Sequence, residues 1–120
     1  MWYCVHAFLY FAYKDGDQCD YPGWENMYLI EADSVDQARQ KGRDRARADE
    51  GDSEGTLTYD GRPAKVTLAG LIKIIACEDL DLDTGKPSDG TEVSYTDLLI
   101  ADKTQLQNLL AGEPAVVTYQ

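Results

Sequence analysis

The sequence predicts a single α+β domain over residues 1–120, with a mostly antiparallel sheet of about five strands and two helices on one face. Apolar segments rich in aromatic and β-branched residues alternate with short polar loops, and two segments begin with a helix N-cap. The elements follow the order β-β-α and then β-β-α-β. A length of 120 residues fits one domain, and a hydrophobic content of 43% is enough to build one core.

The first strand is expected at residues 2–12, where apolar side chains occupy both alternating faces. A strand of this kind is typical of a central position in a sheet. Residues 14–23 have the Asp, Gly and Pro content of a loop. A second strand at 25–32 is expected to run antiparallel to the first across that loop.

The first helix is expected from about Val35 to about Ala48. Ser34 is a suitable N-cap, and Gln37 stands three residues later, where it completes a capping box. One narrow stripe of the helix is small or apolar and consists of Val35, Ala38, Gly42 and Ala46. This stripe predicts a helix that packs closely on the sheet.

The second half of the chain repeats the strand-and-helix order. Asp60-Gly61 predicts a two-residue hairpin turn, and Pro63 keeps that segment at a sheet edge. A long apolar strand is expected at 65–77, within which Gly70 indicates a bulge or a close helix contact. The remaining elements are a strand at 91–101, a short helix capped by Asp102 with Leu106, Leu109 and Leu110 on its buried face, and a strand at 115–119.

The balance of charge argues against a general nucleic-acid-binding protein. The chain has 22 acidic residues against 11 Lys and Arg, a formal net charge of −11. Five of these cations fall within residues 39–47, but helical spacing divides them between two flanks of the expected helix. We favour a solvated helix side. The alternative is a phosphate or RNA contact by Arg39, Arg43 and Arg47, which share one side.

No sequence motif specifies a catalytic reaction. Cys4 and His6 alternate onto one face of the first strand, which could bring a thiol near an imidazole. Nucleophilic catalysis would also require an orienting partner and an electropositive pocket, and the acidity of the chain argues against the latter. We therefore expect a protein that is not an enzyme and has no cofactor.

The segment at 79–90 resembles a calcium-binding loop only at its start. Asp79, Asp81 and Asp83 stand at alternate positions. Thr84 occupies the position that needs glycine, and Gly90 occupies the position that needs a bidentate glutamate. The sequence therefore predicts no metal site.

Cysteine use and the N-terminal segment indicate the compartment. The three cysteines are widely spaced and form no C-x-x-C, which suggests reduced thiols in a cytoplasm. The apolar N-terminal segment has no basic region and no cleavage site, and it is too short to span a membrane. We expect a cytoplasmic protein with no membrane partner.

Three loops of this chain are acidic, and the first of them also carries aromatic side chains. This combination suits an interface with a basic protein, because the rings anchor the partner and the charges steer it. The alternative is that these acids only confer solubility. The candidate partner-binding residues are Tyr13, Asp15, Asp17, Asp20, Tyr21, Trp24, Glu78, Asp79, Asp81 and Asp83.

Several short segments occur in an order that carries a resemblance over most of the chain. They are Trp2-Tyr3, "YLIEADSVDQA" at 28–38, Asp60-Gly61-Arg62-Pro63-Ala64, "DGTEVSY" at 89–95 and "GEPAVVTY" at 112–119. In this order the chain resembles a bacterial family of small proteins classified only as a domain of unknown function. The family implies no activity and no catalytic residues. In size, acidity and α+β build the chain is also similar to immunity proteins of bacterial toxin systems, which block a toxin that is often a basic nuclease.

Together these features predict a small protein-binding domain. Its most specific form is an immunity-like inhibitor that neutralises a basic protein partner such as a nuclease toxin. Two alternatives stay open: a small-ligand-binding or regulatory domain, and nucleic-acid contact through the Arg-rich helix. The oligomeric state and the strand order are not predicted.

Overall fold

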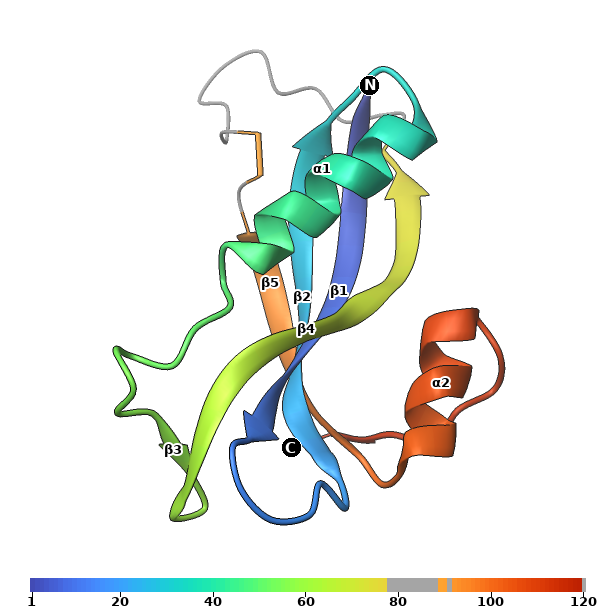
Figure 1. The fold of residues 1–120 in the computed structure, drawn as a ribbon. Helices are drawn as coiled ribbons and strands as arrows, with labels where there is room; N and C mark the ends of the chain where they lie inside the picture. Colours follow the sequence, from blue (N-terminus) through green and yellow to red (C-terminus); the bar gives the residue numbers. More distant parts are fainter. Residues whose placement is uncertain (78–88, 91, 120) are drawn as a thin grey trace.

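The computed structural model describes residues 1–77, 89–90 and 92–119. The elements are β1 (Trp2–Tyr13), β2 (Tyr21–Glu31), α1 (Val35–Arg47), β3 (Thr58–Tyr59), β4 (Arg62–Ala76), β5 (Glu92–Ile100), α2 (Lys103–Ala111) and β6 (Thr118–Tyr119). The six strands pair antiparallel in the order β3-β4-β1-β2-β5-β6, and the sheet is curled (Figure 1). The predicted α+β class is confirmed. Among the described residues, no helix is both long enough and apolar enough to cross a membrane.

Strand β1 has the predicted central position, with β4 on one side and β2 on the other. Strand β2 begins at Tyr21, four residues earlier than the sequence suggested, and it includes Pro22 and Gly23. A Cβ atom at Gly23 would lie 2.0 Å from the carbonyl oxygen of Leu9. The glycine therefore belongs to the strand because it allows the two backbones to approach, and it does not mark a loop.

Helix α1 packs on the sheet through three small residues. Ala38, Gly42 and Ala46 are buried as predicted, whereas Val35, the first residue of the expected stripe, is 45% exposed. A Cβ atom at Gly42 would lie 2.6 Å from Cγ1 of Val5 on β1. The absence of a side chain at Gly42 therefore allows the helix to lie directly on the central strand.

Both predicted helix caps are confirmed. The Ser34 hydroxyl accepts a hydrogen bond from the Gln37 amide at 3.1 Å, and the Gln37 side chain accepts one from the Asp33 amide at 2.6 Å. At the second helix, the Asp102 carboxylate accepts a hydrogen bond from the Gln105 amide at 2.9 Å. Each cap satisfies an amide that has no partner within the helix.

A polar network fastens the end of α1 to the sheet. The Tyr28 hydroxyl donates to Asp49 at 2.5 Å and accepts a hydrogen bond from Asn26 at 2.9 Å. Arg45 donates to Asp49 at 2.9 Å and to the Gly90 carbonyl at 2.8 Å. The network supplies partners for the buried Asn26 and Tyr28, whose polar groups would otherwise be costly to bury.

The predicted hairpin and the predicted long strand are joined. Asp60 and Gly61 have φ angles of 51° and 74°, as a type I′ turn requires, and β4 then runs for 15 residues without interruption. The register against β1 shifts twice, and Gly70 lies at one of the shifts. A Cβ atom at Gly70 would lie 3.4 Å from Leu110 of α2, so both predicted reasons for this glycine apply. The irregularities accompany the curl of β4 across the molecule (Figure 1).

The two helices pack against opposite faces of β1, although the sequence suggested a single face. Val5 and Leu9 belong to the core cluster under α1, whereas Phe8 clusters with Leu106 of α2. Successive residues of a strand point to opposite faces, so each helix covers one of the two apolar faces of β1. Helix α1 lies over one end of the strands, away from the end that carries Tyr13 (Figure 1).

Replacement of Gly42 by Leu should destabilise the fold, because the new side chain would collide with Val5. We expect a loss of roughly 2–3 kcal/mol in the free energy of unfolding, measured by urea denaturation. Gln40→Leu places the same side chain on an exposed position of α1 and should change this free energy by less than about 0.5 kcal/mol. Equal stability of the two variants would contradict the close contact between α1 and β1.

Candidate functional site

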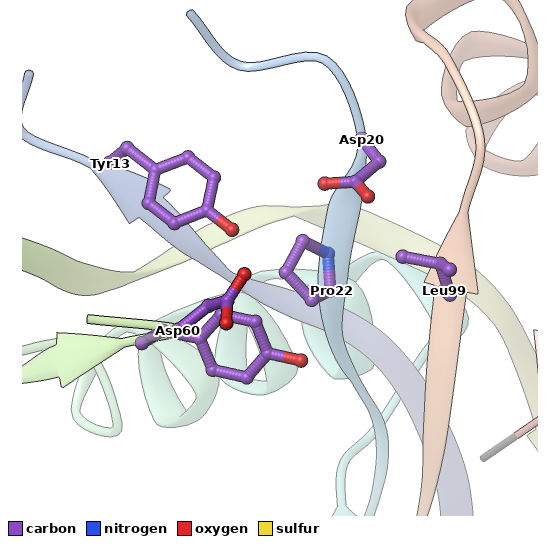
Figure 2. A pocket seen from close by; sticks show the side chains of 6 residues that line it. Tyr13, Asp20, Pro22, Asp60 and Leu99 are labelled. Carbon is purple, nitrogen blue, oxygen red and sulfur yellow. The ribbon is translucent and has the colours of Figure 1, made fainter. Parts of the chain in front are cut away.

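A cleft lies on the α1 face of the sheet, at the Tyr13 end of β1. Six residues line it: Tyr13, Asp20, Pro22, Tyr59, Asp60 and Leu99. Figure 2 shows the Tyr13 hydroxyl and the carboxylates of Asp20 and Asp60 around one opening. The cleft opens to solvent, so a group carried by a larger partner can enter it.

Four segments of the chain build this cleft. Tyr13 ends β1, and Asp20 immediately precedes β2. Pro22 of β2 pairs with Leu99 of β5. Tyr59 and Asp60 come from β3 and the turn after it. The site therefore depends on the strand order, which brings both β3 and β5 to the same end of the sheet as the β1–β2 connection.

A second hollow continues the cleft along the sheet. It is lined by Phe11, Gly23, Trp24, Tyr59 and Asp97, and it shares Tyr59 with the first. The ring of Phe11 lies 4.8 Å from that of Trp24 and 4.4 Å from that of Tyr59, measured between centroids. We call the residues of both hollows together the aromatic–acidic cleft.

The carboxylates of the cleft influence the pKa of the Tyr13 phenol. Burial raises the pKa of this phenol, and the negative charges of Asp20 and Asp60 raise it further, whereas Arg62 lowers it. The hydroxyl therefore stays protonated at neutral pH and can donate a hydrogen bond. A site with two carboxylates beside aromatic rings favours a cation over an anion.

Arg62 holds the loop that carries part of the cleft. Its guanidinium carbon lies 3.6 Å from the centroid of the Tyr13 ring. The same side chain donates hydrogen bonds to the carbonyl oxygens of Asp15 at 2.5 Å and Asp17 at 3.1 Å. The planar fork of an arginine can stack and donate at the same time, so one residue fixes both Tyr13 and the loop.

The structure brings together three of the predicted partner-binding residues. Tyr13, Asp20 and Trp24 line the aromatic–acidic cleft. Tyr21 does not join them, because it lies on the opposite face of β2, where its ring packs on Tyr10 at 5.1 Å. Side chains alternate between the two faces of a strand, so Tyr21 points away from the face that carries Trp24 and the cleft.

The other predicted acidic residues divide into two groups. Asp15 and Asp17 are exposed in the loop between β1 and β2, outside the cleft, where their backbone carbonyls accept from Arg62. The remaining candidates lie outside the described residues and are Glu78, Asp79, Asp81 and Asp83.

Sequence reasoning missed most of the far wall of the cleft. Phe11 could have been found, because it shares a strand face with Tyr13. Tyr59 and Asp60 were recognised only as part of a hairpin, and Asp97 only as part of a strand. Their position beside Tyr13 requires the strand order, which no local pattern contains.

Two arginines of α1 have carboxylates close by on their own helix. Arg39 contacts Asp36 at 2.6 Å, and Arg47 lies 4.0 Å from Asp44. Both of these arginines are exposed, and Arg43 is half-buried. These contacts agree with the favoured interpretation of a solvated helix side.

Residues 2–94 match the family described as a domain of unknown function, DUF4288. The chain belongs to this family. The matched segment contains most of the aromatic–acidic cleft and ends before Asp97 and Leu99. No curated protein and no solved structure matches the chain. The resemblance to a domain of unknown function is confirmed, and no match links this member of DUF4288 to immunity proteins.

Replacement of Arg62 by Ala should loosen the loop at residues 14–20. We expect faster amide hydrogen exchange there, with a global loss below about 1 kcal/mol because the contact is near the surface. Arg62→Lys keeps the charge but not the stacked fork, so its exchange rates should be intermediate. Arg47→Ala on α1 serves as the control and should leave the loop unchanged. Unaltered exchange in Arg62→Ala would show that the arginine does not hold the loop.

Proposed function

We propose that the aromatic–acidic cleft binds a cationic side chain of a basic partner protein. The observation that carries this proposal is the approach of Asp20 and Asp60, from separate segments, to one opening beside Tyr13 and Tyr59 (Figure 2). Carboxylates form charge-assisted hydrogen bonds with guanidinium or ammonium groups, and aromatic faces attract the same cations. Both kinds of group are present within one cleft.

The shape of the site favours a protein partner over a free small molecule. Small-ligand sites bury most of the ligand surface. Here the cleft is open and continues into a second hollow with Phe11 and Trp24, so it offers an extended surface with aromatic anchors. The net charge of −11 would steer a basic protein toward the chain.

The most specific form of the proposal is an inhibitor that acts in the cytoplasm by binding and neutralising a basic nuclease toxin. Its support is the acidity of the chain together with a cleft suited to cations. An arginine that contacts nucleic acid in such a toxin would be a natural occupant of the cleft. Nucleic-acid binding by α1 receives less support, because Arg39 and Arg47 lie beside acidic residues.

Removal of the two carboxylates should weaken binding of a cationic probe. In a Trp2→Phe background Trp24 is the only tryptophan, so its fluorescence reports on the cleft. We expect an oligoarginine peptide to change this fluorescence. Asp20→Asn and Asp60→Asn should each weaken the binding by about tenfold, which corresponds to ~1.4 kcal/mol. The binding should weaken with added salt.

The matched control removes the same charge elsewhere. Asp33→Asn with Glu113→Gln lowers the net negative charge equally at exposed positions outside the cleft. Its affinity for the peptide should stay close to that of the unaltered chain. If the control and the Asp20/Asp60 double variant lose affinity equally, the peptide senses only overall charge and the proposed site is wrong.

A further inference from the structure

A second group of chemically active side chains lies on the opposite face of the sheet from the aromatic–acidic cleft. Cys4 and His6 project from β1 on the face that also carries Phe8. Glu25 of β2 lies opposite Phe8 in the register and so reaches the same face, diagonally from His6. None of these three residues lines either hollow of the cleft.

The three side chains lie in a row, in the order that a nucleophile, a base and an orienting carboxylate require. The Cys4 sulfur lies 3.6 Å from Nε2 of His6. On the other side of the ring, Nδ1 lies 3.5 Å from Oε1 of Glu25. Nδ1 is buried and forms no hydrogen bond with any described residue. The Glu25 carboxylate lies close enough to accept a hydrogen bond from Nδ1 after a small movement. A proton on Nδ1 would leave the lone pair of Nε2 directed toward the thiol.

The surroundings keep the resting pair neutral. Burial lowers the pKa of His6, an effect that Lys73 strengthens and Glu25 opposes. Burial also raises the pKa of the Cys4 thiol; Cys77 and Glu25 raise it further, and Lys73 lowers it. At neutral pH the imidazole is therefore free to accept a proton, and the thiol still carries one.

We propose that Cys4, His6 and Glu25 form a site for acyl transfer from a small thioester to the Cys4 thiol. The Cys4 sulfur attacks the carbonyl carbon while Nε2 of His6 takes the thiol proton. The bond between the carbonyl carbon and the leaving sulfur then breaks, and the proton passes from His6 to the departing thiolate. The products are an acyl thioester on Cys4 and a free thiol. Glu25 acts as a positioning residue that stabilises the imidazolium.

The chain favours this chemistry over metal binding at the same place. Among the described residues, no group of three or more His, Cys, Asp or Glu side chains converges closely enough to hold a metal ion. The sulfur, the imidazole and the carboxylate instead lie in a row, which suits proton transfer from the thiol to the imidazole. Lys73 pairs with His6 across β1 and β4 and supplies a positive charge near the thiol.

The test uses phenyl thioacetate as the probe and the other cysteines as internal references. Peptide mass mapping over time gives the rate of acetylation of each cysteine in the same molecule. Cys4 should react faster than Cys19, although Cys19 is exposed and Cys4 is half-buried. His6→Asn should slow acetylation of Cys4 by about 100-fold and leave Cys19 unchanged. A slower reaction at Cys4 than at Cys19 in the unaltered chain would overturn the proposal.

The pH profile separates a general base from simple ionisation of the thiol. Because the pKa of His6 is lowered, the midpoint of the rise in rate should lie below the ordinary histidine pKa of about 6.5. A rate that shows no rise in that acidic range, and increases only as the thiol ionises near or above the ordinary cysteine pKa of about 8.5, would refute the role of His6. Glu25→Gln should move the midpoint to lower pH, because the carboxylate raises the pKa of His6. This variant leaves Cys4 and His6 in place, and so it tests the proposal even if His6→Asn does not fold.

Discussion

The architecture depends on one constraint, which is that the central strand β1 is apolar on both faces. Val5 and Leu9 point to one face and Phe8 to the other, and all three are almost fully buried. A strand of this kind must be covered twice, because burial of apolar surface is the main favourable term in folding. Helix α1 provides one cover and α2 the other. The curl of β4, with its two register shifts, accompanies this arrangement.

Helix α1 covers only part of the sheet face on which it lies. Helix α1 lies close to the sheet because Gly42 meets Val5 without a side chain, and it extends over only part of the strand length. Toward Tyr13 the same face carries rings and carboxylates in an open cleft. Cys4 and His6 lie on the other face and toward the other end of β1. The two proposed sites are therefore separate, and one can fail without the other.

Three cations of this acidic chain hold backbone segments in place. Arg62 donates to two loop carbonyls, Arg45 to that of Gly90, and Lys41 to that of Glu31. Lys41 and Arg45 also pair with the carboxylates of Asp89 and Asp49. The carboxylates of Asp20 and Asp60 both raise the pKa of Tyr13, so the cleft retains a negative potential despite the nearby Arg62.

The sequence by itself determined the class of fold, the helix caps, the hairpin turn and the close packing of α1, because each depends on residues near one another in the chain. Ser34, Asp102, Asp60-Gly61 and Gly42 are examples. It also predicted that Tyr13, Asp20 and Trp24 belong to one surface. Only the tertiary structure decided that Tyr59 and Asp60 complete that surface, that Tyr21 leaves it, and that Glu25 joins Cys4 and His6. Tyr21 leaves the surface because β2 already begins at that residue, so side-chain alternation turns it to the other face. The other two outcomes depend on strand order and register, which arise from pairing between distant segments.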